Sequence, residues 1–232
     1  AWQRFITQYW ELTLYTLFVG LVAGIICTVL GFVFAYAARF KAGVHGDTLM
    51  LATLITLFGG YLVKIYAWKS ILGADGLLNQ TLMASGLATE PLAFLIYSRG
   101  AVIVALVHFL LPFAILPIYV SLEKVDRTLL EAATDLGDGP IRRFLRITLP
   151  LSMPGVVSAI LIVMIPTVGD FVTPRLVGGK DGVMIANQIQ AQFGKASNWP
   201  LGAALSVTTM VVVTALAAAV VFILRTFARM MK

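Results

Sequence analysis

Residues 131–150 read Glu-Ala-Ala-Thr-Asp-Leu-Gly-Asp-Gly-Pro-Ile-Arg-Arg-Phe-Leu-Arg-Ile-Thr-Leu-Pro and form a charged stretch between long apolar ones. Around its start, four apolar residues follow the spacing i, i+3, i+4 and i+7: Leu129, Ala132, Ala133 and Leu136. That spacing predicts one apolar face of a short helix. Gly137 is expected to end this helix, because glycine adopts a left-handed cap without penalty. Pro140 suits the first turn of a second helix, so we predict two short helices bent at Gly137.

The regions around this segment are apolar and long. A helix needs about 20 apolar residues to cross roughly 30 Å of hydrocarbon. Five stretches qualify: residues 12–38, 48–68, 101–122, 150–171 and 201–224. Of the 232 residues, 59% are hydrophobic and only 12% are charged, against about 25% charged in soluble domains. The predicted fold class is therefore an all-α integral membrane protein with a bundle of five visible transmembrane helices. This composition excludes a disordered, fibrous or ordinary water-soluble protein.

The basic residues indicate an orientation in the bilayer. Five spans put the two chain ends on opposite sides, and three segments share the side of the C-terminus: the connection at Arg39 and Lys41, residues 123–149, and the C-terminal tail. These segments carry ten of the 17 Lys and Arg residues. Basic residues near span ends favour the cytoplasmic side, so we expect a cytoplasmic C-terminus. This also explains the net charge of +6 without nucleic acid as a partner. The longer connections, 69–100 and 172–200, are expected outside.

The charged segment also carries a signature. Glu-Ala-Ala, three residues, Gly, nine residues and Ile-x-Leu-Pro resembles the coupling loop of permease subunits of binding-protein-dependent ABC importers. The chain is most similar to the spermidine/putrescine permease family, and specifically to its first membrane subunit. The stretches that support this resemblance include 111–113 (Leu-Pro-Phe), 121–124 (Ser-Leu-Glu-Lys), 150–155 (Pro-Leu-Ser-Met-Pro-Gly), 169–174 (Gly-Asp-Phe-Val-Thr-Pro) and 198–200 (Asn-Trp-Pro). Members usually have six spans, so the resemblance implies either that an N-terminal one is missing here or that this protein departs from the family pattern.

The resemblance implies a single ABC transporter transmembrane domain over residues 1–232, with its cytoplasmic coupling loop at 123–149. In such importers the two short helices of the loop dock into a cleft of an ATPase subunit and transmit its closure to the membrane helices. The matching positions are these: Glu131, Ala132, Ala133, Gly137, Ile147, Leu149 and Pro150. The implied partners are a second permease subunit, two cytoplasmic ATPase subunits, an external substrate-binding protein and the lipid bilayer of the bacterial inner membrane.

Catalytic motifs are absent from the sequence. No GxxxxGK[ST] phosphate loop occurs, so ATP and Mg are expected on the partner ATPase subunits and not on this chain. His45, His108 and the single Cys27 are isolated in the sequence, which argues against a metal site or an internal disulfide. We therefore expect a transport subunit and not an enzyme.

Charged and aromatic residues at the outer ends of the spans are candidates for the substrate path. Asp170 is one, because charge in hydrocarbon is costly and often functional. Phe171, Tyr66 and Trp68 are expected to help it hold a polyamine ammonium through cation–π contacts. The alternative is that Asp170 only caps or braces the outer loop. Lys64 argues against a strongly acidic path, unless it extends to the interface.

The substrate and the class of transporter leave alternatives open. Polyamines are the first expectation, while related importers carry opines, phosphonates or ferric iron. An ion-coupled secondary transporter or channel would need buried charge pairs or inverted repeats, and neither is evident in the sequence. A membrane scaffold without transport activity would have no use for the coupling loop.

Overall fold

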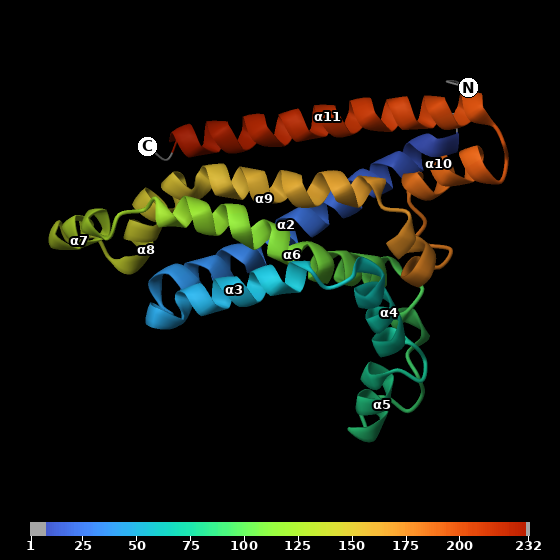
Figure 1. Cartoon of the computed structure of the whole chain (residues 1–232), viewed down its shortest axis with the longest axis horizontal. Coiled ribbons are helices and arrows are strands. Elements are labelled where there is room, and N and C mark those ends of the chain that lie inside the picture. The colour runs from blue at the N-terminus through green and yellow to red at the C-terminus, as the bar shows by residue number, and fades with distance from the viewer. Residues whose placement is uncertain (1–7, 231–232) are drawn as a thin grey trace. The chain divides into compact units, whose positions relative to one another are not determined.

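The computed structural model describes residues 8–230, apart from the side chains of the last two of these (Figure 1). Every regular element in this range is helical. The α-helices are α2 (Trp10–Phe40), α3 (Gly46–Leu57), α4 (Tyr61–Leu72), α5 (Leu77–Ala84), α6 (Arg99–Glu123), α7 (Arg127–Asp135), α8 (Pro140–Arg143), α9 (Leu149–Gly169), α10 (Ile185–Gly194) and α11 (Trp199–Met230). Short 3₁₀ or π turns connect them: η2 (Gly43–His45), η3 (Ala93–Leu95), η4 (Phe144–Thr148) and η5 (Pro174–Gly178). The all-α fold class expected from the sequence is confirmed.

Four helices within residues 8–230 are long and apolar enough to cross a membrane: α2, α6, the continuous run Pro140–Gly169, and Trp199–Ala228 of α11. They coincide with four of the five predicted spans. In their most apolar windows, 44–50% of the residues of the first three are buried, against 6% for α11. Most of α11 is therefore open to lipid or to another protein.

The prediction of one continuous span over residues 48–68 is wrong. The helix ends at Leu57 and begins again at Tyr61. Gly60 has ψ 130° and is not helical. Phe58 precedes a pair of glycines, and each glycine inside a helix costs about 1 kcal/mol relative to alanine. Helices α3 and α4–α5 are long and apolar enough to cross a membrane only when they are taken together as a bent pair. Such a pair is a broken span or a re-entrant loop.

The described chain divides into two compact units, and the division cuts across the long helices. One unit contains the chain up to Ala23, Phe58–Phe109 and Met164–Val213. The other contains Gly24–Leu57, Leu110–Val163 and the chain from Thr214. We call them the outer and the inner unit, after the predicted sides of their connections. The long connections 69–100 and 172–200 belong to the outer unit, and all three basic segments belong to the inner unit.

Close helix packing in the inner unit occurs at two glycines. A Cβ atom added to Gly31 of α2 would lie 3.4–3.5 Å from Ala114 and Ile115 of α6, which is ordinary contact. A Cβ atom added to Gly155 of α9 would collide with the carbonyl oxygen of Pro117 in α6. Glycines of this kind let membrane helices approach closely, so α6 packs against both α2 and α9.

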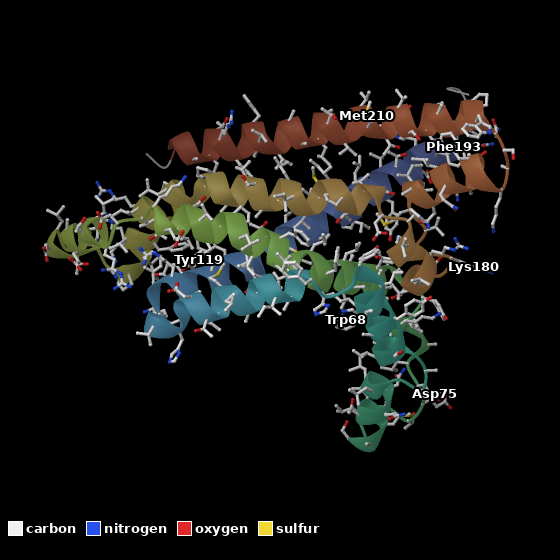
Figure 2. All side chains as sticks on the ribbon, in the orientation of Figure 1. Trp68, Asp75, Tyr119, Lys180, Phe193 and Met210 are labelled. Carbon is white, nitrogen blue, oxygen red and sulfur yellow. The ribbon has the colours of Figure 1, made fainter. Side chains whose placement is uncertain are left out.

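The outer unit has its own close contacts. A Cβ atom added to Gly20 of α2 would lie 3.2 Å from the carbonyl oxygen of Met164 in α9. The ring of Phe193, labelled in Figure 2, packs 5.5 Å from the ring of Trp199, and a Cβ atom on Gly202 would lie 3.0 Å from it. These contacts fix the turn between α10 and α11.

Candidate functional site

The segment between α6 and α9 folds as a pair of short helices, α7 and α8, beginning with a capped N-terminus. The carboxylate of Asp126 accepts a hydrogen bond of 3.0 Å from the main-chain N–H of Thr128. This is the usual N-cap arrangement, which satisfies one of the free N–H groups of a helix start. The bond lowers the pKa of the fully exposed Asp126 carboxyl below its ordinary value. The cap was not among the residues selected from the sequence, although an Asp before an amphipathic helix is a recognised signal.

Gly137 ends α7 in the predicted way. Its φ is +87°, in the left-handed region that favours glycine. The N–H of Gly137 donates to the carbonyl of Thr134, and the N–H of Asp138 donates to the carbonyl of Ala133, both at 2.9 Å. These two bonds form a Schellman motif. The bend that the sequence predicts at Gly137 is confirmed, while its role in coupling stays a prediction.

Helix α8 begins at Pro140, as predicted, but it does not end before the next span. It passes through the π turn η4 into α9, so residues 140–169 form one helical run. In the π turn, the N–H of Leu149 donates to the carbonyl of Phe144. A regular turn would bring the ring of Pro150 against the carbonyl four residues earlier, and we attribute the wider turn to this ring. Ile147, Leu149 and Pro150 thus lie inside a helix and not at its boundary.

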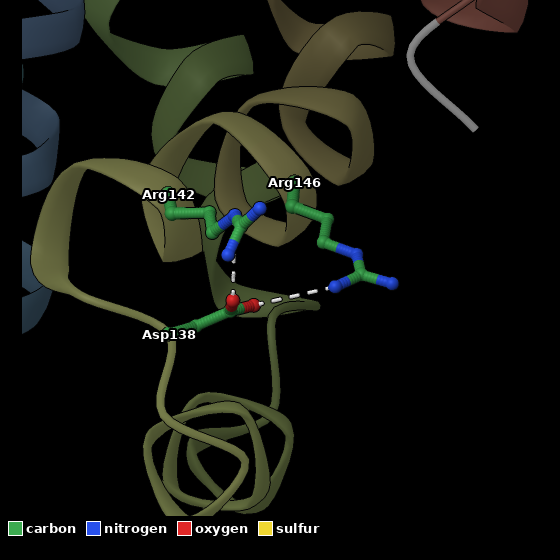
Figure 3. A network of polar contacts seen from close by, with 3 residues as sticks. All are labelled: Asp138, Arg142 and Arg146. Atoms are coloured by element: carbon green, nitrogen blue, oxygen red, sulfur yellow. Dashed lines mark ion pairs between the residues drawn. The ribbon is translucent and has the colours of Figure 1, made fainter.

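Ion pairs brace the turn between α7 and α8. The carboxylate of Asp138 lies 3.6 Å from Nε of Arg142 and 3.5 Å from Nη1 of Arg146 (Figure 3). The side chain of Asp138 is 8% exposed, whereas those of the two arginines are 76% and 70% exposed. Each arginine therefore contacts the buried carboxylate of Asp138, while most of its own side chain faces solvent.

Arg143 connects the two helices directly. Its Nη1 donates to the hydroxyl of Thr134 and, at 3.4 Å, to the carbonyl of Leu130, both in α7. Arg143 thus turns back onto its own loop. The pair α7–α8 is consequently a braced unit.

Several large apolar side chains of this pair are exposed among its charged residues. Of the predicted apolar face of α7, Ala133 is buried, while Leu129, Ala132 and Leu136 are exposed. Leu136 is 86% exposed and Ile141 of α8 is 77% exposed. Exposed apolar residues that gather on a surface mark an interaction site. We call Leu129, Leu136, Ile141 and Leu145 the exposed apolar cluster.

The base of the loop rests on the end of α2. The ring of Phe144 makes edge contacts with the rings of Phe32 and Tyr36, at centroid distances of 5.7 and 6.0 Å. Aromatic pairs in this geometry contribute about 0.5–1.5 kcal/mol beyond their buried area. They bind the loop to α2 within the inner unit.

Glu131 lies beside a cavity at the same place. The cavity has a volume of about 230 Å³ and lies between the end of α2 and α7. Its lining consists of Tyr36, Phe40, Lys41, Arg127, Leu130, Glu131, Arg143 and Thr148. The exposed carboxylate of Glu131 therefore has three cations of its own chain around the same cavity. We call this space the loop-base cavity.

In the outer unit, Asp170 follows α9 and caps the turn after it. Its carboxylate accepts hydrogen bonds from the N–H groups of Val172, at 2.8 Å, and Thr173, at 3.2 Å, and from the Thr173 hydroxyl. The Thr173 hydroxyl also lies 2.9 Å from the hydroxyl of Tyr61 in α4. This is the bracing arrangement that the sequence leaves open as the alternative to substrate contact.

The comparisons with known proteins identify the family. Residues 48–231 match the family described as "Binding-protein-dependent transport system inner membrane component". The chain belongs to this family. As expected of a family member, it is a multi-pass membrane protein of the permease type.

The relatives of this permease include proteins named for spermidine and putrescine transport. It is 38% identical over 205 residues to "Spermidine/putrescine transport system permease protein PotB" of Escherichia coli (strain K12), which covers 88% of this chain and 74% of that protein. The protein of the same name from Haemophilus influenzae is 38% identical over 186 residues, or 80% and 65% of the two chains. "Inner membrane ABC transporter permease protein YdcU" of Escherichia coli (strain K12) is 31% identical, over 88% of this chain and 68% of that protein.

Solved structures show the same fold. A bacterial ABC transporter involved in the import of the acidic polysaccharide alginate superposes with a TM-score of 0.63 at 14% identity, covering 97% of this chain and 87% of that one. The MetNI methionine ABC transporter superposes with a TM-score of 0.54 at 20% identity, covering 96% and 92%. At these identities the likeness concerns the fold alone.

The four residues predicted for the substrate path of the permease do not form one cluster of contacts in the described chain. The ring of Trp68 packs 5.7 Å from the imidazole of His108, and the exposed ring of Tyr66 lies 6.0 Å from Nζ of Lys69. Phe171 is partly exposed beside Asp170, and its carbonyl accepts a 2.7 Å hydrogen bond from Asn187. The aromatic residue joined to Asp170, through Thr173, is Tyr61.

Among residues 8–230, no group of three or more His, Cys, Asp or Glu side chains lies close enough together to hold a metal ion.

Proposed function

We propose that this chain is the membrane permease subunit of an ATP-driven importer of polyamines such as spermidine and putrescine. Family membership and an all-helical fold with four long apolar helices support the transport role. The polyamine substrate is supported by 38% identity, over 88% of the chain, to permeases named for spermidine and putrescine. Opines, phosphonates and ferric iron are alternative substrates for importers of this class.

We propose further that α7–α8 is the element through which a separate ATPase drives the permease. The observation that carries this proposal is the exposed apolar cluster on a braced pair of helices. Burying such side chains against a partner stabilises a complex by about 25 cal/mol per Å² of apolar surface. A loop held by a Schellman turn, by the ion pairs of Asp138 and by Arg143 transmits a displacement, whereas a flexible loop would absorb it.

Glu131, Ala132, Ala133, Gly137, Ile147, Leu149 and Pro150 remain the proposed coupling residues. Their positions suggest different tasks. Ala133 is buried and sets how close α7 lies to its neighbours, Gly137 makes the bend, and Ile147, Leu149 and Pro150 continue the loop into α9. Glu131 acts from the loop-base cavity.

The proposed assembly contains a second permease subunit, two cytoplasmic ATPase subunits that bind ATP and Mg, and an external substrate-binding protein. The small buried fraction of α11 supports contact with lipid or the second permease. The basic segments all belong to the inner unit, and basic segments favour the cytoplasm. We therefore propose that α7–α8 and the C-terminus are cytoplasmic, in the bacterial inner membrane.

For the substrate path we propose Tyr66 and Phe171 as aromatic surfaces for an ammonium group, together with Trp68 of α4. The exposure of Tyr66 and Phe171 supports this assignment. Asp170 is proposed to act on the path mainly by positioning residues 171–173, because its carboxylate already accepts three hydrogen bonds.

The test is reconstitution in liposomes. The chain is assembled with its second permease and ATPase, the binding protein is added, and uptake of radiolabelled spermidine is measured with and without ATP. We expect uptake that requires both ATP and the binding protein, and that unlabelled putrescine suppresses. Uptake driven by an ion gradient without the ATPase would contradict the importer. ATP-dependent uptake of a different solute would retain the importer and reject the polyamine substrate.

A further inference from the structure

We propose that the loop-base cavity is a binding site for a phosphate-bearing anion. The site is separate from the exposed apolar cluster proposed to meet the ATPase, because it lies between α7 and the end of α2. It does not depend on the identity of the transported solute.

The charge around the cavity is unbalanced. Lys41, Arg127 and Arg143 line it together with a single acid, Glu131. The ion pairs within 4.0 Å in the described residues are those of Asp138, so Glu131 is not in direct contact with any of these cations. A net charge of +2 therefore surrounds a space of about 230 Å³. An anion would remove the mutual repulsion of the three cations.

The donors present suit phosphate oxygens. Arginine and lysine form charge-assisted hydrogen bonds with phosphate, and arginine does so with two N–H groups at once. Tyr36 and Thr148 also line the cavity, and a hydroxyl group is a further possible hydrogen-bond donor to phosphate. Pockets for drug-sized ligands measure about 300–1,000 Å³, so the cavity suits a small phosphate group and not a large ligand.

The location suits a lipid headgroup. Lys41 is the first residue after α2, a long apolar helix of an inner membrane component, and such helix ends lie near the headgroups. Basic pockets between helices at the cytoplasmic side bind anionic headgroups. Free phosphate from the cytoplasm offers the same oxygens, so the two sources share one chemistry and are separated by experiment.

The experiment measures binding to the purified full-length chain in an uncharged detergent. The probes are short-chain phosphatidylglycerol, inorganic phosphate and, as the zwitterionic control, short-chain phosphatidylcholine. Lys41→Gln/Arg127→Gln removes two cations from the cavity, and Lys180→Gln/Lys195→Gln removes two exposed lysines of the outer unit as the matched control. We expect the cavity variant to bind roughly tenfold more weakly and the control to bind like the unmodified chain.

Binding of phosphatidylglycerol alone, lost in the cavity variant, supports a lipid site. Binding of inorganic phosphate as well, lost in the same variant, supports a site for the free anion. The proposal is overturned if neither anionic probe binds more tightly than phosphatidylcholine, or if both double variants bind equally. Should the cavity variant fail to fold, Glu131→Gln decides: tighter anion binding supports the site, and unchanged or weaker binding rejects it.

Discussion

The backbone of Gly155 in α9 lies directly against the carbonyl oxygen of Pro117 in α6. Any Cβ atom at position 155 would collide with this oxygen and with the side chain of Ser121. Alanine normally stabilises a helix relative to glycine by about 0.5–1 kcal/mol. At this position we expect the opposite: Gly155→Ala should destabilise the chain by about 1–3 kcal/mol through overpacking. Thermal unfolding in detergent measures the effect.

Gly169 provides the control for this prediction. It lies in the same helix, and a Cβ atom there would meet nothing within 4 Å. Gly169→Ala should leave the midpoint of thermal unfolding unchanged or raise it slightly. Equal midpoints for the two variants would show that α6 and α9 do not touch at Gly155.

Gly137 and Gly139 form a natural pair for testing the bend in the loop. Valine at 137 would have to adopt a φ of +87°, which costs an L-residue roughly 1–2 kcal/mol. At 139, φ is −68° and valine fits. We expect Gly137→Val to leave ATP hydrolysis uncoupled from uptake, and Gly139→Val to transport normally.

The measurement is the ratio of transported substrate to hydrolysed ATP in assembled complexes. Gly137→Asn should restore part of the coupling, because asparagine tolerates the left-handed region. Normal transport by an assembled Gly137→Val complex would remove Gly137 from the coupling mechanism.

Asp138 is expected to stabilise the turn between α7 and α8. Asp138→Asn removes both ion pairs, to Arg142 and Arg146. Since the arginines are mostly exposed, we expect a local loss of about 1 kcal/mol or less. Amide hydrogen exchange over residues 139–146 should accelerate severalfold, while exchange in α6 should not change. Asp135→Asn, at an exposed position of the same loop, serves as the control, and equal acceleration in both variants would rule out the ion pairs as the cause.

The N-cap of α7 has a predictable dependence on pH. The hydrogen bond from Thr128 lowers the pKa of the Asp126 carboxyl in the folded chain. Its stabilising effect is therefore complete above the unfolded pKa of about 3.9 and is lost as the pH falls through the lower folded value. A carboxyl-carbon NMR titration of Asp126 should give a midpoint below about 3.9. A midpoint at or above this value would mean that the cap does not form in solution.

Variants of Asp170 and Tyr66 distinguish a bracing role in the outer loop from direct contact with the substrate. We expect Asp170→Asn to lower thermal stability, because the amide nitrogen that replaces Oδ2 cannot accept the hydrogen bond from the Thr173 hydroxyl. We expect Tyr66→Leu to raise the KM for spermidine severalfold and leave stability unchanged. Uptake assays and thermal unfolding on both variants give the answer, and the reverse pattern would make Asp170 the substrate ligand.

Much of the fold follows from hydropathy, because four long apolar stretches have no alternative to helices in a bilayer. The loop follows from Gly137 and Pro140, whose backbone preferences act locally. Hydropathy does not predict the break between Leu57 and Tyr61, because a hydropathy value averaged over a window does not register a pair of glycines that disrupts the helix. A glycine pair within an apolar run is the signal that identifies it.

The missed site residues are those whose partners are distant or depend on side-chain direction. Tyr61 is joined to Asp170 through Thr173, a partner 112 positions away in the chain. Asp138 follows the expected cap, yet its spacing alone does not show that it turns inward to meet Arg142 and Arg146. The loop-base cavity brings Lys41 beside Glu131, and no periodicity in the sequence connects them.

The π turn between α8 and α9 has a mechanical consequence. Residues 140–169 form a continuous helical run of 30 residues, which at 1.5 Å per residue corresponds to a rod about 45 Å long. The widened turn offsets the rod by one residue without interrupting it. A displacement applied at Ile141 would therefore pass into α9 along a continuous hydrogen-bonded helix, and not across a flexible connection.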